Sequence, residues 1–82
     1  TNYAAIFAGG NVGIGTTTPG STLTVGGPVN LKNYTVATLP AGVQGDIAYV
    51  TDALAPAFLV IIAGGGAVVT PVFYNGTNWV GF

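Results

Sequence analysis

Charged residues are almost missing from this chain. Of its 82 residues only Lys32, Asp46 and Asp52 are charged, and cysteine, histidine and methionine are absent, whereas an ordinary soluble domain is roughly a quarter charged. A single basic residue cannot neutralise phosphates or dock on anionic lipids, so we expect no nucleic-acid partner. Without cysteine there are no disulfides or thiolate metal sites, and without histidine, cysteine or glutamate the usual catalytic groups are missing. We therefore expect no enzyme activity and no cofactor.

The two aspartates are the remaining candidates for acid–base chemistry. Asp46 and Asp52 would share one face of an extended strand, but their separation there would be about 20 Å. That distance is well beyond the spacing of the carboxylate pair in glycosidases. The favoured interpretation is that both lie at strand ends and accept hydrogen bonds from turn N–H groups.

Half of the chain is apolar in spite of this lack of charge. A domain of this size buries only about 60–65% of the surface that its unfolded chain exposes. The remainder would face water with almost no charge to keep it soluble, so we predict that copies of the chain cover this surface on one another. The longest apolar run, residues 53–69, is interrupted by Pro56 and by three glycines. A spanning helix needs about 20 mostly apolar residues, so we expect no membrane insertion.

Turn and strand signals predict an all-β fold. Strong helix formers are scarce, and no window holds apolar residues at helical spacing. We expect residues 1–31 to form a short-stranded, intertwined homotrimeric stem, residues 32–40 a connector, and residues 41–82 a small antiparallel β head. The expected strands are 3–8, 12–15, 22–25 and 29–31 in the stem, and 45–52, 57–63, 67–74 and 79–82 in the head. Asn75-Gly76 predicts the turn of a terminal hairpin.

Alternation along the stem strands predicts an apolar face. Val12 and Ile14 share one face of a strand, while Gly13 and Gly15 share the other and allow another backbone to approach closely. Strands this short are marginal alone, and they become stable when several chains share an apolar axis. The residues expected at this oligomer interface are Ile6, Val12, Ile14, Leu23, Val25, Val29 and Leu31.

Two parts of the chain resemble bacteriophage fibre proteins. GNVGIGTTTP at residues 10–19, followed by LTV at 23–25, resembles a segment of phage tail fibres and tail spikes that recurs in trimeric shafts. Residues 45–53 and 71–79 look like a small C-terminal module of phage structural and fibre proteins. The resemblance implies an extracellular, homotrimeric virion fibre whose distal knob contacts the host surface. The charged catalytic dyad of the self-cleaving chaperone domain of such fibres is missing here, so that activity is not implied.

The best candidates for ligand binding lie around the expected hairpin. Aromatic rings beside amide and hydroxyl groups provide the flat apolar platform and the directional hydrogen bonds that sugars require. The candidate residues are Tyr74, Asn75, Thr77, Asn78 and Trp79. The alternative interpretation is that Trp79 and Phe73 fill the core, because a small β head needs large side chains.

These observations leave two hypotheses for function. The first is the tip of a trimeric virion tail fibre that attaches to a glycan or another receptor on the host cell surface. The second is a purely structural protein without a ligand, either a capsid or tail decoration protein or a subunit of an extracellular filament. Both hypotheses make the chain its own main partner.

Overall fold

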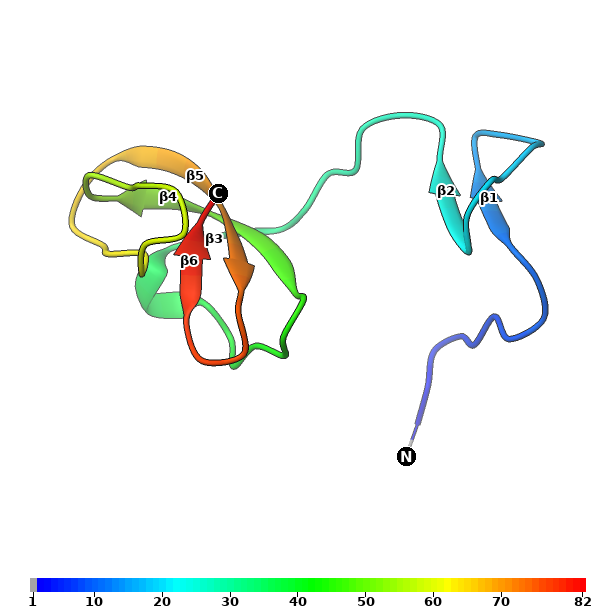
Figure 1. The fold of residues 1–82 in the computed structure, drawn as a ribbon, viewed down its shortest axis with the longest axis horizontal. Coiled ribbons are helices and arrows are strands. Elements are labelled where there is room, and N and C mark those ends of the chain that lie inside the picture. The colour runs from blue at the N-terminus through cyan, green and yellow to red at the C-terminus, as the bar shows by residue number, and fades with distance from the viewer. Residues whose placement is uncertain (1) are drawn as a thin grey trace. The chain divides into compact units, whose positions relative to one another are not determined.

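The computed structural model describes residues 2–82 as two compact units, of which the first ends at Asn30 and the second is Leu31–Phe82. The described residues form two β-sheets and one short 3-10 helix, so the all-β prediction is confirmed (Figure 1). The expected boundary between stem and connector after residue 31 lies next to the division between the units.

The first unit contains one small sheet of two parallel strands, β1 (Val12–Ile14) and β2 (Leu23–Val25). Both strands lie where the alternation of branched residues and small residues predicts them. Gly13 allows the loop after β1 to fold back, because a Cβ at this position would lie 2.6 Å from the Thr16 carbonyl oxygen. The expected close approach of backbone is therefore made by the same chain.

The other two strands expected in the stem are not formed. Residues 3–8 and 29–31 are irregular, and all of them are exposed. A short apolar segment becomes a strand only when its N–H and C=O groups pair with a neighbouring strand. The described part of one chain offers these two segments no such partner, and that is the physical reason for the difference.

The second unit is built on a four-stranded sheet in the order β3-β4-β5-β6 (Figure 1). The strands β4 (Ile47–Ala53), β5 (Val68–Tyr74) and β6 (Trp79–Gly81) are antiparallel neighbours, as expected for the head. The short strand β3 (Asn33–Tyr34) adds to β4 in parallel, and the helix η1 (Val36–Thr38) follows it. The segment expected as a connector thus contributes a strand to the head sheet.

A bulge and a proline shape the middle of this sheet. The register between β4 and β5 shifts between Val50 and Ala53, which is the mark of a β-bulge. Pro71 lies within β5, where a central strand normally excludes proline because it has no N–H to donate. It is tolerated because β6 ends at Gly81, whose partner is Val72, so the regular ladder stops before Pro71. Pro71 therefore lies on a central strand, in register with Tyr49 of β4 and just beyond the end of the regular pairing with β6.

The terminal hairpin forms as predicted. Residues 75–78 connect β5 to β6, and Gly76 has a positive φ of 101° that glycine adopts at little cost. The Asn75 side-chain oxygen accepts hydrogen bonds from the backbone N–H groups of Thr77 and Asn78, both at 2.9 Å. The turn is therefore determined by local chemistry, which is why the sequence alone predicts it.

Residues 57–63 do not form the buried strand that their apolar run predicts. Among them only Ile62 is buried, and the chain runs along the outer edge of β6 through isolated bridges from Phe58 to Gly81 and from Ile61 to Val80. Leu59 interrupts a regular strand because its φ is +60°, a left-handed conformation that branched and bulky residues rarely adopt. Periodicity could not reveal this, because a continuous apolar run looks the same whether it is buried or not.

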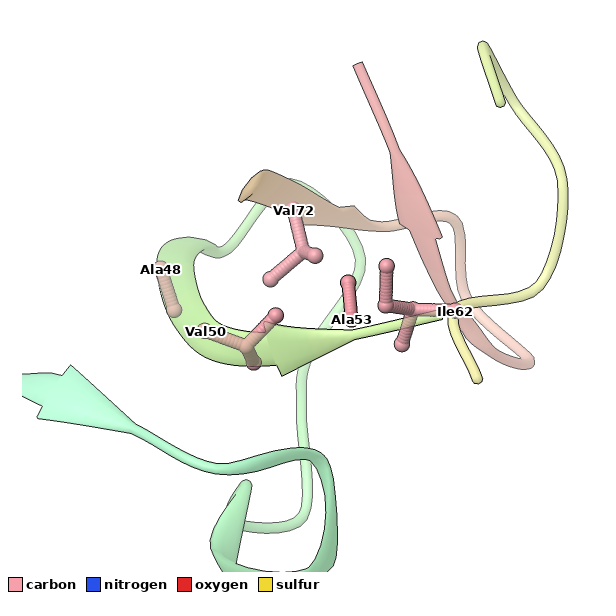
Figure 2. Close-up of a cluster of buried hydrophobic side chains, with 5 residues drawn as sticks. All are labelled: Ala48, Val50, Ala53, Ile62 and Val72. Atoms are coloured by element: carbon pink, nitrogen blue, oxygen red, sulfur yellow. The ribbon is translucent and has the colours of Figure 1, made fainter. Parts of the chain in front are cut away.

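The core of the second unit is small and made largely of valine and alanine. Val50, Val72 and Val80 are its largest completely buried side chains. Figure 2 shows the central cluster of Ala48, Val50, Ala53, Ile62 and Val72, contributed by β4, β5 and the segment after β4. Partly buried side chains extend this cluster from the outside, namely Tyr34, Val36, Leu39 and Trp79.

Candidate functional site

The apolar face of the first unit is the first candidate site. In the parallel sheet Val12 is the register partner of Leu23, and Ile14 is the partner of Val25. Register partners lie on the same face of a sheet, so all four side chains share one face. Ile14 and Leu23 are 56% and 60% exposed, while Val12 and Val25 are half-buried.

This face is hollowed as well as apolar. A depression of about 450 Å³ is lined by Phe7, Val12, Ile14, Thr22 and Leu23. Phe7 and Thr22 were not among the residues expected at the interface. The sequence signal for Phe7 was its position beside Ile6 in an apolar stretch, whereas nothing in the sequence singled out Thr22.

The remaining residues expected at the oligomer interface lie outside the strands. Ile6 and Val29 are 66% and 63% exposed, and Leu31, at the start of the second unit, is 38% exposed. These three side chains are as accessible to solvent as interface residues of an unassembled chain. Their pairing with another copy remains a prediction.

The outer edges of the two-stranded sheet are open in the same way. β1 and β2 pair only with each other among the residues that the structure describes. Each strand therefore presents one row of backbone N–H and C=O groups without a ladder partner. Such edges pair readily with a strand of another chain.

The aromatic side chains of the hairpin form the second candidate site. Tyr74 and Trp79 are cross-strand partners, and their rings meet edge to face with centroids 5.2 Å apart. The Tyr74 hydroxyl donates a hydrogen bond to the Thr77 carbonyl oxygen, and the Trp79 indole N–H donates one to the Pro40 carbonyl oxygen, both at 3.0 Å. Both polar groups are thus already used within the chain.

The structure also assigns Trp79 and Asn75 to the packing of the head. Trp79 is half-buried and packs against the core cluster, as the alternative interpretation of its role predicts. Asn75 holds the turn through its side-chain oxygen. Of the five candidate residues, Thr77 and Asn78 are therefore the two whose side chains make no hydrogen bond within residues 2–82.

The three charged side chains all have partners in the second unit. Asp52 accepts a hydrogen bond from the Val36 N–H at 2.8 Å, and Asp46 accepts one from the Val43 N–H at 2.9 Å. Both aspartates thus accept hydrogen bonds from backbone N–H groups, as the favoured interpretation expects, although Asp52 lies inside β4 and its donor belongs to η1 rather than to a turn. The Lys32 ammonium lies 4.5 Å from the centre of the Tyr34 ring, a cation–π contact.

Residues 2–82 contain no group of three or more histidine, cysteine or acidic side chains that could hold a metal ion. Within the same residues no helix has the length and the apolar character required to cross a bilayer.

Comparisons of this chain with protein-family models, curated proteins and solved structures gave no match.

Proposed function

We propose that this chain is the tip of a trimeric virion tail fibre, extracellular and located on the phage particle, that attaches to glycans on the host cell surface. One observation carries the proposal. Val12, Ile14, Leu23 and Val25 share one face of a sheet whose two outer edges lack partners, and no residue described in this unit is buried. A unit without a core of its own gains one when copies close their apolar faces around a common axis.

The resemblance of residues 10–19 to trimeric fibre shafts supports three copies rather than two. Three pairs of parallel strands can surround an axis, each β1 beside the β2 of the next copy, so that the open edges pair and the hollow beside Ile14 and Leu23 is filled. The residues of the hairpin loop lie in the other unit, where residues 75–77 are exposed and Asn78 is half-buried. Thr77 and Asn78 are the side chains that we assign to glycan contact.

Sedimentation equilibrium and host-cell labelling together test this proposal. The chain should sediment as a trimer and label host cells, and Ile14→Asp should abolish the trimer because a charge at the shared axis has no partner. Thr17→Asp is the matched control, since it adds the same charge at an exposed loop position of the same unit. A trimer that survives Ile14→Asp would contradict the buried-axis arrangement.

One observation favours the structural alternative, a decoration protein or filament subunit without a ligand. The hydrogen-bonding groups of Tyr74 and Trp79 and the Asn75 side-chain oxygen are engaged within the head. The contacts of these residues within the head therefore account for their presence without a bound sugar. A glycan array separates the two functions: Asn78→Ala should keep the trimer and weaken binding in the attachment role, whereas a trimer that binds no glycan and no cell supports the structural role.

A further inference from the structure

A second apolar surface lies on the head, outside both candidate sites. We define it as the C-terminal patch, made of Phe58, Leu59, Val60, Val68, Val69 and Phe82. Each of these side chains is about half exposed or more, and Phe58 and Val69 reach 75% and 65%. None of them belongs to the apolar face of the first unit or to the hairpin loop.

Four members of the patch lie together although they are far apart in the sequence, and Leu59 and Val60 follow Phe58 directly in the chain. Phe58, Val68, Val69 and Phe82 together line one depression of about 320 Å³, beside Pro56 and Gly81 and within the second unit. Phe82 is held in position because its N–H donates to the Pro71 carbonyl oxygen and its ring meets the Phe73 ring edge to face. The surface therefore has a projecting ring, Phe58, beside a hollow that can receive an apolar side chain.

The segment that presents Phe58 is fixed by backbone hydrogen bonds. The Leu59 N–H donates to the Gly81 carbonyl oxygen at 2.7 Å, and the Gly81 N–H donates to the Val60 carbonyl oxygen at 3.1 Å. Ala55 and Leu59 have positive φ values of 46° and 60°, which residues other than glycine adopt only when their surroundings impose it. The structure thus keeps these apolar side chains on the outside instead of letting the segment fold them inward.

The size and the charge of the patch indicate what covers it. With the exposed fractions given by the structure, its six residues leave roughly 600 Å² open to water, which is at the upper end of the about 300–600 Å² of the largest apolar patch on a typical monomer. Two such surfaces would bury about 1,200 Å² when completely covered, which is above the about 1,000 Å² that a specific protein–protein interface needs. The patch contains no charge, so two copies meet without desolvating an ionised group, and anionic lipid has nothing to attract it.

We propose that the C-terminal patch binds a second copy of this chain, with Phe58 of one head in the hollow beside Val69 of the other. This contact between heads is separate from the contact between stems and does not depend on the proposed attachment function. It gives the chain two independent self-interfaces, one in each unit. In Ile14→Asp, which should lose the trimer, the head contact should still hold two copies together.

Sedimentation of four forms of the full chain tests this proposal: wild type, Val69→Asp, Ile14→Asp and the double variant. In Ile14→Asp only the head contact is left. The double variant should therefore associate at least tenfold more weakly than Ile14→Asp and should sediment as a monomer. Ala41→Asp adds the same charge at an exposed head position outside the patch and should change nothing. Phe58→Asp provides a second patch variant, and circular dichroism verifies that each variant keeps its β structure.

The outcomes separate this proposal from the proposed function. If Val69→Asp and Phe58→Asp, both folded, sediment like their parents in both backgrounds, the head contact is refuted while the stem contact stands. If Ile14→Asp alone changes nothing, the stem contact fails and the head contact is judged by the patch variants. Co-sedimentation with phosphatidylcholine vesicles tests a lipid partner: vesicle binding lost in Val69→Asp, with self-association unchanged, would overturn the proposal.

Discussion

Asp52 links two segments of the head through a single hydrogen bond. Its carboxylate accepts from the Val36 N–H sixteen residues away, in a partly buried position, and so holds η1 beside β4. In Asp52→Ala this N–H is left without its acceptor, which should lower the free energy of unfolding by about 1–3 kcal/mol. Asp46→Ala is the matched control, because the bond from Val43 is exposed and its loss should cost less than about 1 kcal/mol. Urea unfolding of both variants measures the difference, and equal losses would contradict this role of burial.

Asn75 and Asn78 are two asparagines of one turn with different predicted roles. Of the two side chains, that of Asn75 accepts hydrogen bonds from the turn backbone and that of Asn78 does not. Asn75→Ala should therefore lower the free energy of unfolding by about 1 kcal/mol, since water replaces part of what the exposed N–H groups lose. Asn78→Ala should leave thermal stability unchanged, so a loss of cell attachment in that variant reports binding alone. A melting temperature that falls equally in both would show that the turn depends on both side chains.

The strand β5 has one buried face and one open face, and substitutions along it should differ accordingly. Val72 is completely buried between β4 and β6, whereas Val69 is 65% exposed. Val72→Ala should lower the free energy of unfolding by about 2 kcal/mol, because it removes buried methyl groups and leaves a cavity in a small core. Val69→Ala should change it by less than about 0.5 kcal/mol. Chemical denaturation of the Ile14→Asp chain and of these two variants in it, diluted until all three sediment as monomers, removes both contacts between copies and provides the comparison.

Elements whose cause is local could be predicted from the sequence, and elements that depend on distant partners could not. The hairpin around Asn75-Gly76 and the strands β1 and β2 follow from turn chemistry and alternation within a few residues. β3 forms because Asn33 and Tyr34 pair with Tyr49 and Val50. No local sequence pattern predicts that a two-residue strand will pair in parallel with a distant one. The segment 57–63 departs from its predicted strand for the same reason, because its course is set by hydrogen bonds to β6.

The candidate sites show the same limit. The alternation of Val12 and Ile14 was sufficient to place these two side chains on one apolar face. For Tyr74 and Trp79 the sequence showed aromatic groups near a turn, but not that their polar atoms are bonded to the Thr77 and Pro40 carbonyl oxygens. The C-terminal patch could not be predicted from the sequence, because a continuous apolar run does not indicate which of its side chains the fold leaves exposed.

At the scale of the whole molecule, the small number of charges determines how the assembly responds to salt. Lys32, Asp46 and Asp52 lie outside both apolar surfaces, so screening has no ion pair to weaken there. Self-association should therefore be unchanged between about 0.05 and about 1 M sodium chloride, and sodium sulfate should strengthen it by favouring apolar burial. Light scattering across both series measures this. Dissociation by sodium chloride would indicate an electrostatic interface instead.

The segment along β6 has a consequence for storage at high concentration. Its backbone groups occupy the ladder positions that this border of the head sheet would otherwise offer to a neighbour, and the opposite border, β3, is only two residues long. Strand-by-strand templating, the route to amyloid, begins at long unoccupied borders. We expect concentrated solutions to resist fibrillation at the head, so that crowded copies remain folded particles.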